Sequence, residues 1–335
     1  ERTAIANARI NIAWIAGILL PALSLPLLFG ALDGQDGRFV VDNYHIYGLL
    51  SALVVLVSAG ICIYGTRQFI PRLLSVAERN KISSGFRGMV RDTLETLQNI
   101  NFRRILIFEI AVGATFGIQG ALNMITWTYF WELTTAQTSY VMLSSVVAVA
   151  LVFPSMGYLA ARWQKQQLLT FAVAGLVLNT AWLVPGRLLG LLPENGTQLL
   201  IALVFVQNLM TTALVILRTV NLHSIMADIA DEHELASGRR QEGVFFAATT
   251  FALKFIMGFG YMVAGPLLDV VGLEAGVAPG EASASALLGI GIVIGPVMAL
   301  CLVVPWWMSI RLDVSRERLE QVQAELEQRA PGTAP

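Results

Sequence analysis

The sequence predicts an all-α protein that crosses a membrane about eight times, and its composition and the length of its apolar runs support that prediction. Of the 335 residues, 56% are hydrophobic and only 13% are charged, whereas a soluble domain usually carries about a quarter charged residues. A chain with so few charges cannot cover a water-exposed surface, so a membrane is its expected environment. Helices are the expected form of each span because they satisfy their own backbone hydrogen bonds in lipid.

Eight apolar runs reach the roughly 20 residues that a helix needs to span the hydrocarbon core. The spans are expected near residues 10–31, 46–65, 105–131, 139–161, 168–189, 198–223, 244–271 and 285–310. Lys and Arg gather after the second, fourth, sixth and eighth spans, whereas the opposite loops hold only Arg38 and Arg187. The positive-inside rule therefore predicts cytoplasmic termini and places Arg38 and Arg187 outside.

The longest polar segment, residues 67–104, is expected to link two helical bundles in the cytoplasm. Residues 1–66 would then hold the last two helices of the N-terminal bundle, residues 105–311 a six-helix C-terminal bundle, and residues 312–335 a cytoplasmic tail. Apolar residues recur at helical spacing within the linker, which fits either a helix on the membrane surface or a partly ordered segment. These residues are Phe86, Met89, Val90, Leu94 and Leu97.

Composition and residue placement disfavour several function classes. The net charge of −1 does not provide the clustered basic face that nucleic acid needs. Cys62 and Cys301 lie inside apolar runs, and His45, His223 and His233 are scattered over different spans and loops. This placement suggests neither a disulfide framework nor a metal site, and an enzyme in the membrane would need its reactive groups at one depth. The sequence has no Gly-rich Lys-Ser/Thr motif, so ATP-driven transport is not supported.

A strongly charged stretch, MADIADEHELASGRRQEG at residues 226–243, separates the sixth and seventh apolar runs. Asp228 and Asp231 follow one span, and Arg239 and Arg240 precede the next, so the stretch is expected to be a cytoplasmic loop. Pairing of these acids with these bases would form a cytoplasmic gate, and the alternative is a solvated loop that only sets topology. Each such pair near water contributes only about 0–1 kcal/mol, which suits a gate that must open.

The charged stretch and the helix after it resemble the glycoside–pentoside–hexuronide:cation symporter family, typified by the melibiose permease. The matching residues are Asp228, Ile229, Asp231, Glu234, Gly238, Arg239, Glu242, Gly243 and Lys254. Glu232 stands where the family often has Tyr, and the opening ERTAIANARINIAWIAGILLPAL is similar to the segment leading into the family's fifth helix. The resemblance implies the major facilitator fold, with helices five to twelve present and the first four missing, in a bacterial inner membrane.

Lys254 is the charged residue expected to lie deepest in a span. It sits about ten residues into its run, which is roughly 15 Å at 1.5 Å per residue, and a charge there costs about 3 kcal/mol or more. It is expected to face a polar interior beside a carboxylate, on the helical face of Thr250, Gly258 and Tyr261. The resemblance implies that this Lys couples transport to Na⁺ or H⁺ through carboxylates of the missing second and fourth helices, and snorkelling is the alternative. No other cofactor is expected.

Two polar stripes at helical spacing are the expected solute-binding residues. The stripes are Thr115, Gln119, Asn123 and Thr126 in the third span, and Gln207, Thr211, Arg218 and Asn221 in the sixth. Such side chains can hydrogen-bond sugar hydroxyls or can join helices to one another. Arg218 would bind solute, snorkel, or pair with Glu242 or Asp228. Arg9 matches an Arg that helps to bind sugar in the melibiose permease, and an interfacial role is its alternative.

The expected function is therefore secondary active transport of a glycoside or related small solute, coupled to a cation by alternating access. A lipid or lysolipid carrier of the same fold is the alternative, which a more apolar cavity would distinguish, and an intramembrane enzyme is disfavoured. The eight-span chain is expected not to transport alone. The lipid bilayer is the other expected partner, and amphipathic rings at the outward end of the third span are expected to form an interfacial belt. These rings are Trp127, Tyr129, Phe130 and Trp131.

Overall fold

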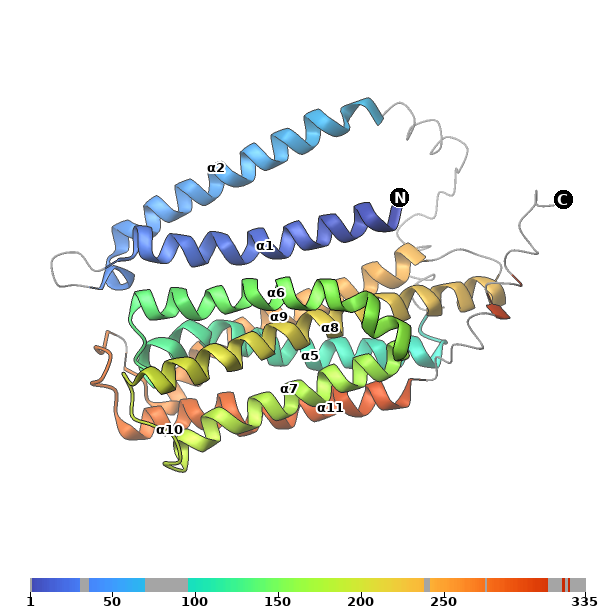
Figure 1. Ribbon diagram of the computed structural model, residues 1–335. Coiled ribbons are helices and arrows are strands. Elements are labelled where there is room, and N and C mark those ends of the chain that lie inside the picture. Colours follow the sequence, from blue (N-terminus) through green and yellow to red (C-terminus); the bar gives the residue numbers. More distant parts are fainter. Residues whose placement is uncertain are drawn as a thin grey trace.

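A computed structural model shows long helices that run roughly side by side (Figure 1). The structure describes residues 2–30, 36–69, 96–237, 242–274 and 276–312, with residues 321–322 and 325, and the side chains of residues 2–14, 236–237 and 242 lie outside this description. Within it the α-helices are α1 (Arg2–Leu28), α2 (Val41–Thr66), α5 (Ile100–Ile125), α6 (Thr135–Arg162), α7 (Lys165–Leu188), α8 (Gln198–Ser237), α9 (Glu242–Val271), α10 (Ala284–Ile292) and α11 (Met298–Arg311). Four short turns accompany them: η1 (Gly37–Phe39), η2 (Arg67–Phe69), η3 (Thr126–Phe130) and η4 (Val293–Val297).

The predicted all-α membrane architecture is confirmed. Seven helical segments of the described chain are long and apolar enough to cross a membrane, and they correspond to the second to eighth predicted spans. The first predicted span falls on α1, and the part of α1 whose side chains are described, Ile15–Leu28, is apolar. Helix η3 continues α5, and η4 joins α10 to α11, so each pair of labels forms one span.

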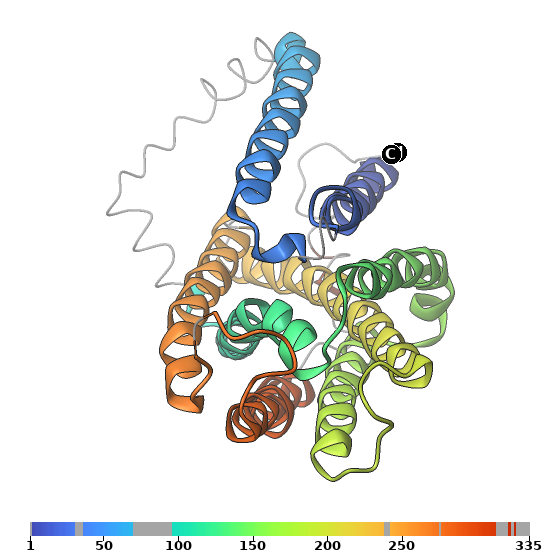
Figure 2. The same cartoon turned by 90° about the vertical axis from the view of Figure 1, so that its left-hand side faces the viewer.

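Helices α5 to α11 pack around one another, whereas α1 and α2 lie along one side of this group (Figure 2). Helix α1 packs mainly on α6, and α2 contacts mainly α1 and the short helices at its own two ends. No residue of α2 is buried, and its apolar side chains are exposed along its length. A continuous exposed apolar surface of this kind is typical of contact with a membrane or with another protein surface.

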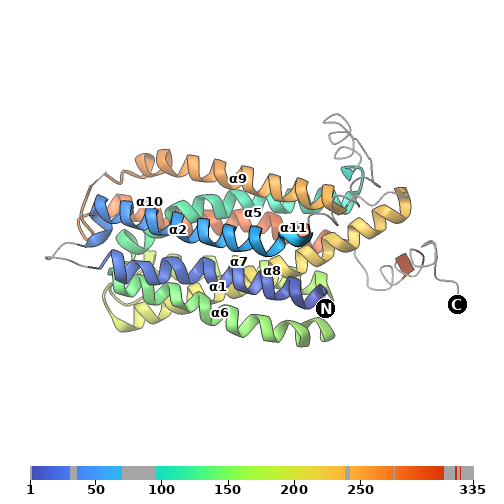
Figure 3. The ribbon, with the colours of Figure 1, turned by 90° about the horizontal axis from the view of Figure 1, so that it is seen from above.

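The predicted loop at residues 226–243 is mostly helix, which corrects that prediction. Helix α8 has 40 residues and continues to Ser237, so its end projects past the neighbouring helices (Figure 3). At 1.5 Å per residue it is roughly 60 Å long, about twice the hydrocarbon thickness. The stretch ADIADEHELA contains neither Gly nor Pro, so nothing in it breaks a helix. Arg239 and Arg240 lie outside the described residues.

Helix α5 begins at Ile100, five residues before the predicted span, because Asn99 caps it. The Asn99 side chain accepts hydrogen bonds from the backbone N–H groups of Asn101 and Phe102, which satisfies two of the donors that a helix start leaves free. Of the predicted linker helix, Leu97 packs against the buried core around Phe102. The other residues predicted for it lie outside the described chain.

Glycines bring α5 and α9 into close contact. A Cβ on Gly117 would lie 2.5 Å from the carbonyl oxygen of Met257, and a Cβ on Gly260 would lie 2.9 Å from the backbone of Gly117. One turn away, a Cβ on Gly113 would lie 3.0 Å from the carbonyl oxygen of Leu253. Small residues allow membrane helices to approach at this range. The contact holds α9 beside α5, the helix that carries the first polar stripe.

The aromatic residues at the end of α5 belong to the core, so the predicted interfacial belt is wrong. Trp127, Phe130 and Trp131 are buried against α6, α7 and α8. Tyr129 is half-buried, and its hydroxyl donates to the carbonyl oxygen of Val277 at 3.1 Å. These residues lie in or directly after the π-helical turn η3. Because a π-turn inserts an extra residue, it rotates the side chains that follow relative to an uninterrupted α-helix.

Candidate functional site

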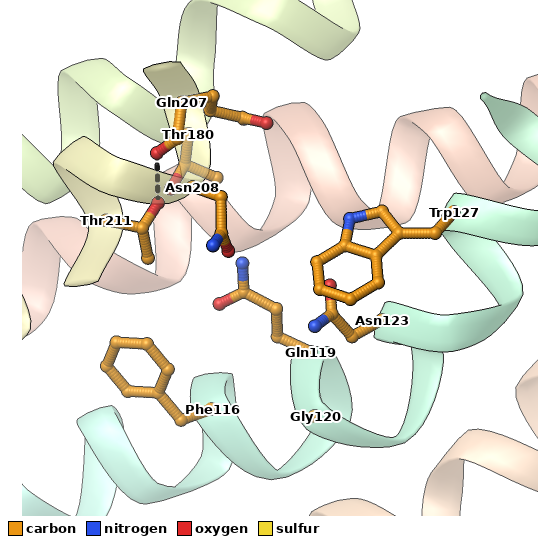
Figure 4. Close-up of a pocket in the computed structure, with 9 residues that line it drawn as sticks. All are labelled: Phe116, Gln119, Gly120, Asn123, Trp127, Thr180, Gln207, Asn208 and Thr211. Carbon is orange, nitrogen blue, oxygen red and sulfur yellow. Dashed lines mark hydrogen bonds between the residues drawn. The ribbon is translucent and has the colours of Figure 1, made fainter. Parts of the chain in front are cut away.

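A polar cavity of about 190 Å³ lies between α5, α7 and α8 (Figure 4). Amides and hydroxyls make up most of its wall, and Phe116 and Trp127 add two aromatic rings. The lining residues are Phe116, Gln119, Gly120, Asn123, Trp127, Thr180, Gln207, Asn208 and Thr211. The cavity can therefore offer several hydrogen bonds together with flat apolar surface to one small polar solute.

The two predicted polar stripes converge in this cavity. Gln119 and Asn123 come from α5, and Gln207 and Thr211 come from α8. A spacing of four residues places each pair on one face of its helix. Since the two helices belong to distant parts of the chain, only their packing turns two separate stripes into one wall.

The two α5 amides are available to a ligand. Gln119 and Asn123 point into the cavity (Figure 4), and both are half-buried. Within the part of the chain that the structure describes, neither side chain makes a hydrogen bond. Each side-chain amide supplies two donors and an acceptor, so these donors and acceptors of Gln119 and Asn123 can all bond to a solute.

The α8 wall is held in place by α7. Asn179 Nδ2 donates to Thr211 Oγ1 at 2.8 Å and to the Gln207 carbonyl oxygen at 3.0 Å. Gln207 Nε2 donates back to the Asn179 carbonyl oxygen at 3.3 Å, and Trp182 Nε1 donates to Asn179 Oδ1 at 3.1 Å. Gln207 and Thr211 therefore line the cavity and also join α8 to α7, so both interpretations of the second stripe apply to them.

The α6 side fixes Asn208, a cavity residue that the sequence analysis missed. Asn208 Nδ2 donates to the hydroxyls of Ser144 and Ser145, each at 2.9 Å, and to the Val141 carbonyl oxygen at 3.1 Å. These bonds occupy the amide nitrogen of Asn208. Asn208 was missed because it directly follows Gln207, whereas the second stripe was recognised by a spacing of four residues.

A second polar cluster lies at the end of the bundle where α1 meets α2, which is the predicted extracellular end (Figure 1). Arg38 of η1 has a side chain only 6% exposed. Its Nη1 donates to Thr128 Oγ1 at 2.9 Å, and its Nη2 donates to the Leu133 carbonyl oxygen at 2.9 Å. Its Nε and Nη2 also donate to Asp36 at 2.7–3.1 Å, and Asp36 Oδ1 accepts from Thr135 Oγ1 at 2.8 Å. We name these five residues the Arg38 latch.

The latch ties the α1–α2 connection to η3 and α6. Burial by itself raises the pKa of Asp36, but hydrogen bonds from Arg38 and Thr135 and the charge of Arg38 together lower the pKa below its usual value. The carboxylate is therefore ionised at neutral pH. Thr128 follows the cavity residue Trp127, and the Leu133 N–H donates to the Trp127 carbonyl oxygen at 2.8 Å. The latch and the cavity thus share the turn η3.

Residues 1–316 match the model of the family described as MFS/sugar transport protein. This chain belongs to the MFS/sugar transport protein family. Membership implies a transporter of a sugar-type small molecule rather than an enzyme, and with its apolar helices it makes the chain a multi-pass membrane protein. A search of curated proteins finds no match to the chain.

Other predicted site residues of this MFS protein lie away from the cavity. The hydroxyl of Thr126 donates to the Leu122 carbonyl oxygen at 2.8 Å, and that of Thr115 donates to the Ala111 carbonyl oxygen at 2.9 Å. Both residues are buried, and each bonds within its own helix. Asn221 behaves in the same way on α8. The structure therefore places Thr126 outside the cavity, although its spacing suggested a place in the same stripe.

Lys254 shares one face of α9 with Thr250, Gly258 and Tyr261, as the spacing predicted, but this face is exposed among the described residues and does not turn to the expected polar interior. In the described part of the chain it makes no ion pair, so the carboxylate expected beside it is not among these residues. A Cβ on Gly120 would lie 2.6 Å from the Tyr261 hydroxyl. The face that carries Lys254 therefore reaches the rim of the cavity.

Asp228 pairs with Lys165, an ion pair that the sequence analysis did not predict. Lys165 Nζ donates to the two carboxylate oxygens of Asp228 at 2.7 and 2.9 Å. The helical continuation of α8 turns Asp228 toward the start of α7, so the pair joins two neighbouring helices of one group. Asp231 is half-buried on the same extension. The predicted basic partners, Arg239 and Arg240, lie outside the described residues, as does the side chain of Arg9.

Arg218 pairs with Glu109 and not with Asp228, and the side chain of Glu242 lies outside the described residues. Its Nη1 donates to Glu109 Oε1 at 3.2 Å, and both side chains are buried. Glu109 was missed because it stands alone within the third apolar run. Its position was nevertheless a usable signal, since an acid inside a membrane span is a functional-site hypothesis in itself.

Proposed function

We propose that this MFS protein is a cation-coupled symporter that binds a glycoside or a related sugar in the cavity between α5, α7 and α8. The observation that carries the proposal is the wall chemistry: four amides, two hydroxyls and an indole surround one small space. Amides and hydroxyls match the alternating donors and acceptors of a sugar, and the Trp127 ring offers a flat apolar face to a pyranose. A lipid or lysolipid would favour a mainly apolar wall.

The Arg38 latch supports alternating access as the mechanism. In the proposed topology, with both termini in the cytoplasm of a bacterial inner membrane, the latch closes the extracellular end. Opening toward the outside then requires Arg38 to release Thr128 and Leu133. Helix η3 carries both Thr128 and the cavity residue Trp127. Solute contact with Trp127 would therefore shift the equilibrium between the closed and the open Arg38 latch.

Coupling to Na⁺ or H⁺ is part of the same proposal. Lys254 is a cation inside a span, on a face that continues from the cavity rim. By the resemblance to the glycoside–pentoside–hexuronide:cation symporters, acids of the second and fourth helices would complete that site. Arg9 remains a proposed sugar ligand, and Arg239 and Arg240 remain proposed cytoplasmic-gate residues together with Asp228 and Asp231.

The test is uptake by proteoliposomes that contain the protein as its gene encodes it, with radiolabelled glycosides, hexoses and a lysophospholipid offered in turn. We expect Na⁺- or H⁺-driven uptake of a glycoside, and weaker binding of it by Asn123→Leu. One lost hydrogen bond of about 0.5–1.5 kcal/mol predicts a weakening of about 2- to 12-fold. Thr126→Val is the matched control, because it removes a hydroxyl at the start of η3, outside the cavity. Uptake of the lysophospholipid alone would favour the lipid-carrier alternative and refute the sugar proposal.

A further inference from the structure

The Glu109–Arg218 ion pair is buried inside the membrane-spanning part of the protein, and each of its two side chains has one polar atom without a hydrogen bond among the described residues. Glu109 is 4% exposed and Arg218 is 6% exposed. One hydrogen bond of 3.2 Å joins them, and Arg218 Nη2 also donates to Thr219 Oγ1 at 3.3 Å. Glu109 Oε2 and Arg218 Nε are buried with no hydrogen-bond partner among the described residues. A pair that served packing alone would be expected to satisfy these atoms, because each unsatisfied group carries its full desolvation cost.

The pair lies on the helix faces that build the cavity. Glu109 precedes the cavity residue Phe116 by seven residues on α5, and Arg218 follows the cavity residue Thr211 by seven residues on α8. Seven residues are about two helical turns, or roughly 10 Å, and return to nearly the same face. The pair therefore sits beyond the cavity in the direction of the start of α5, which is the predicted cytoplasmic end.

The charges around Glu109 come from few elements. From α8, Arg218 is its ion-pair partner, and His223 lies within electrostatic reach of both residues. Helix α9 carries Lys254 and α11 ends in Arg311, and neither makes an ion pair with Glu109 in the described structure. The guanidinium disfavours any positive charge at Glu109, so a proton or a metal cation binds only when the ion pair is broken. Glu109 Oε2, the carboxylate oxygen without a partner in the described structure, is enough for a proton, whereas a metal cation needs several oxygen ligands.

We propose that Glu109 is a proton-binding site of the transport cycle and that Arg218 is the residue that positions it. In the step, the Glu109 carboxylate accepts one proton and becomes a neutral carboxylic acid, while Arg218 keeps its charge and loses its ionic partner. Arg218 then has donors free to turn toward the cavity, and loss of the proton restores the ion pair. This inference rests on the proposed symport, since it identifies the proton as a coupling ion and places a coupling residue in the α5–α11 group.

Proton binding can be tested without a transported solute. Purified full-length protein in detergent is titrated while the infrared carbonyl stretch of protonated carboxylic acids is recorded. We expect a titrating band in the wild type that is absent from Glu109→Gln, whereas Glu194→Gln, an exposed acid on the α7–α8 loop, retains it. Arg218→Lys should retain the band with an altered midpoint. A Glu109→Gln spectrum that matches the wild type at every pH would overturn the proposal.

A transport assay then distinguishes a coupling role of Glu109 from a role in helix packing. In proteoliposomes with an imposed pH gradient, we expect Glu109→Gln to lose uphill accumulation of the glycoside identified above while it retains solute exchange at equal concentrations. If Glu109 only held α5 to α8, exchange and accumulation would fall together, and that result would overturn the coupling role. Absence of glycoside transport in the wild type would refute the proposed function instead, and the infrared titration would still decide whether Glu109 binds a proton.

Discussion

Replacement of Arg38 by Gln should open the protein at the end where α1 meets α2. Among the described residues, three hydrogen bonds join the α1–α2 connection to the segment from η3 to α6, and Arg38 donates two of them. A hydrogen bond from a charged donor contributes about 1.5–3 kcal/mol, and Asp36 is 28% exposed, so water compensates part of the loss. We therefore use the lower bound of about 3 kcal/mol for the two bonds, which corresponds to a change of about 100-fold in the ratio of closed to open protein.

The assay is labelling of the cavity from outside the cell. Cys62 and Cys301 are free and exposed, so both are replaced by Ala, and Thr180 in the cavity wall is replaced by Cys. A membrane-impermeant maleimide added outside should react markedly faster when Arg38→Gln is also present. Arg187→Gln is the matched control, because Arg187 donates to the Pro193 carbonyl oxygen within its own α7–α8 connection. An unchanged labelling rate in a folded Arg38→Gln protein would refute the latch.

Three further outcomes are expected. The lowered pKa of Asp36 means that the closed latch binds fewer protons than the open one, so closure is complete above the ordinary value of 3.8 and weakens as the pH falls through the lowered pKa. The labelling rate of Thr180→Cys is therefore divided by its rate in the presence of Arg38→Gln, which cancels the pH dependence of the thiolate; this ratio should stay flat from about pH 8 to about pH 5 and rise only below about pH 4. Gly117→Val should lower the melting temperature in detergent, because its Cβ would lie 2.5 Å from an α9 carbonyl oxygen and overpacking costs about 1–3 kcal/mol; Gly157→Val, which meets open space, should not. Lys254→Ala should abolish gradient-driven accumulation while solute binding in detergent persists, and wild-type accumulation would show that Lys254 only snorkels.

Predictions that depended on the length of apolar runs were confirmed, whereas periodicity along one helix was correct for Gln119 and Asn123 but not for Thr126, which lies outside the cavity. The position and type of the spans follow from the length of apolar runs, because lipid admits few other structures. Gln119 and Asn123, like Gln207 and Thr211, could be paired from their spacing alone. The face that Lys254 shares with Thr250, Gly258 and Tyr261 could be predicted in the same way, but its exposure could not. Glu109 could also have been found, since it is an acid inside an apolar run. Each of these features is decided within about two turns of one helix.

Partner choice for charged residues was decided by the tertiary structure. Asp228 is 63 residues from Lys165, and Arg218 is 109 residues from Glu109. Arg38, which sequence analysis used only for topology, bonds to Thr128 across 90 residues. The sequence by itself determined that this protein is a bundle of membrane-spanning helices with polar faces, because burial in lipid acts on each helix separately. Packing alone decided which faces meet, because contacts between distant segments depend on how whole helices fit together, and no local pattern encodes that fit.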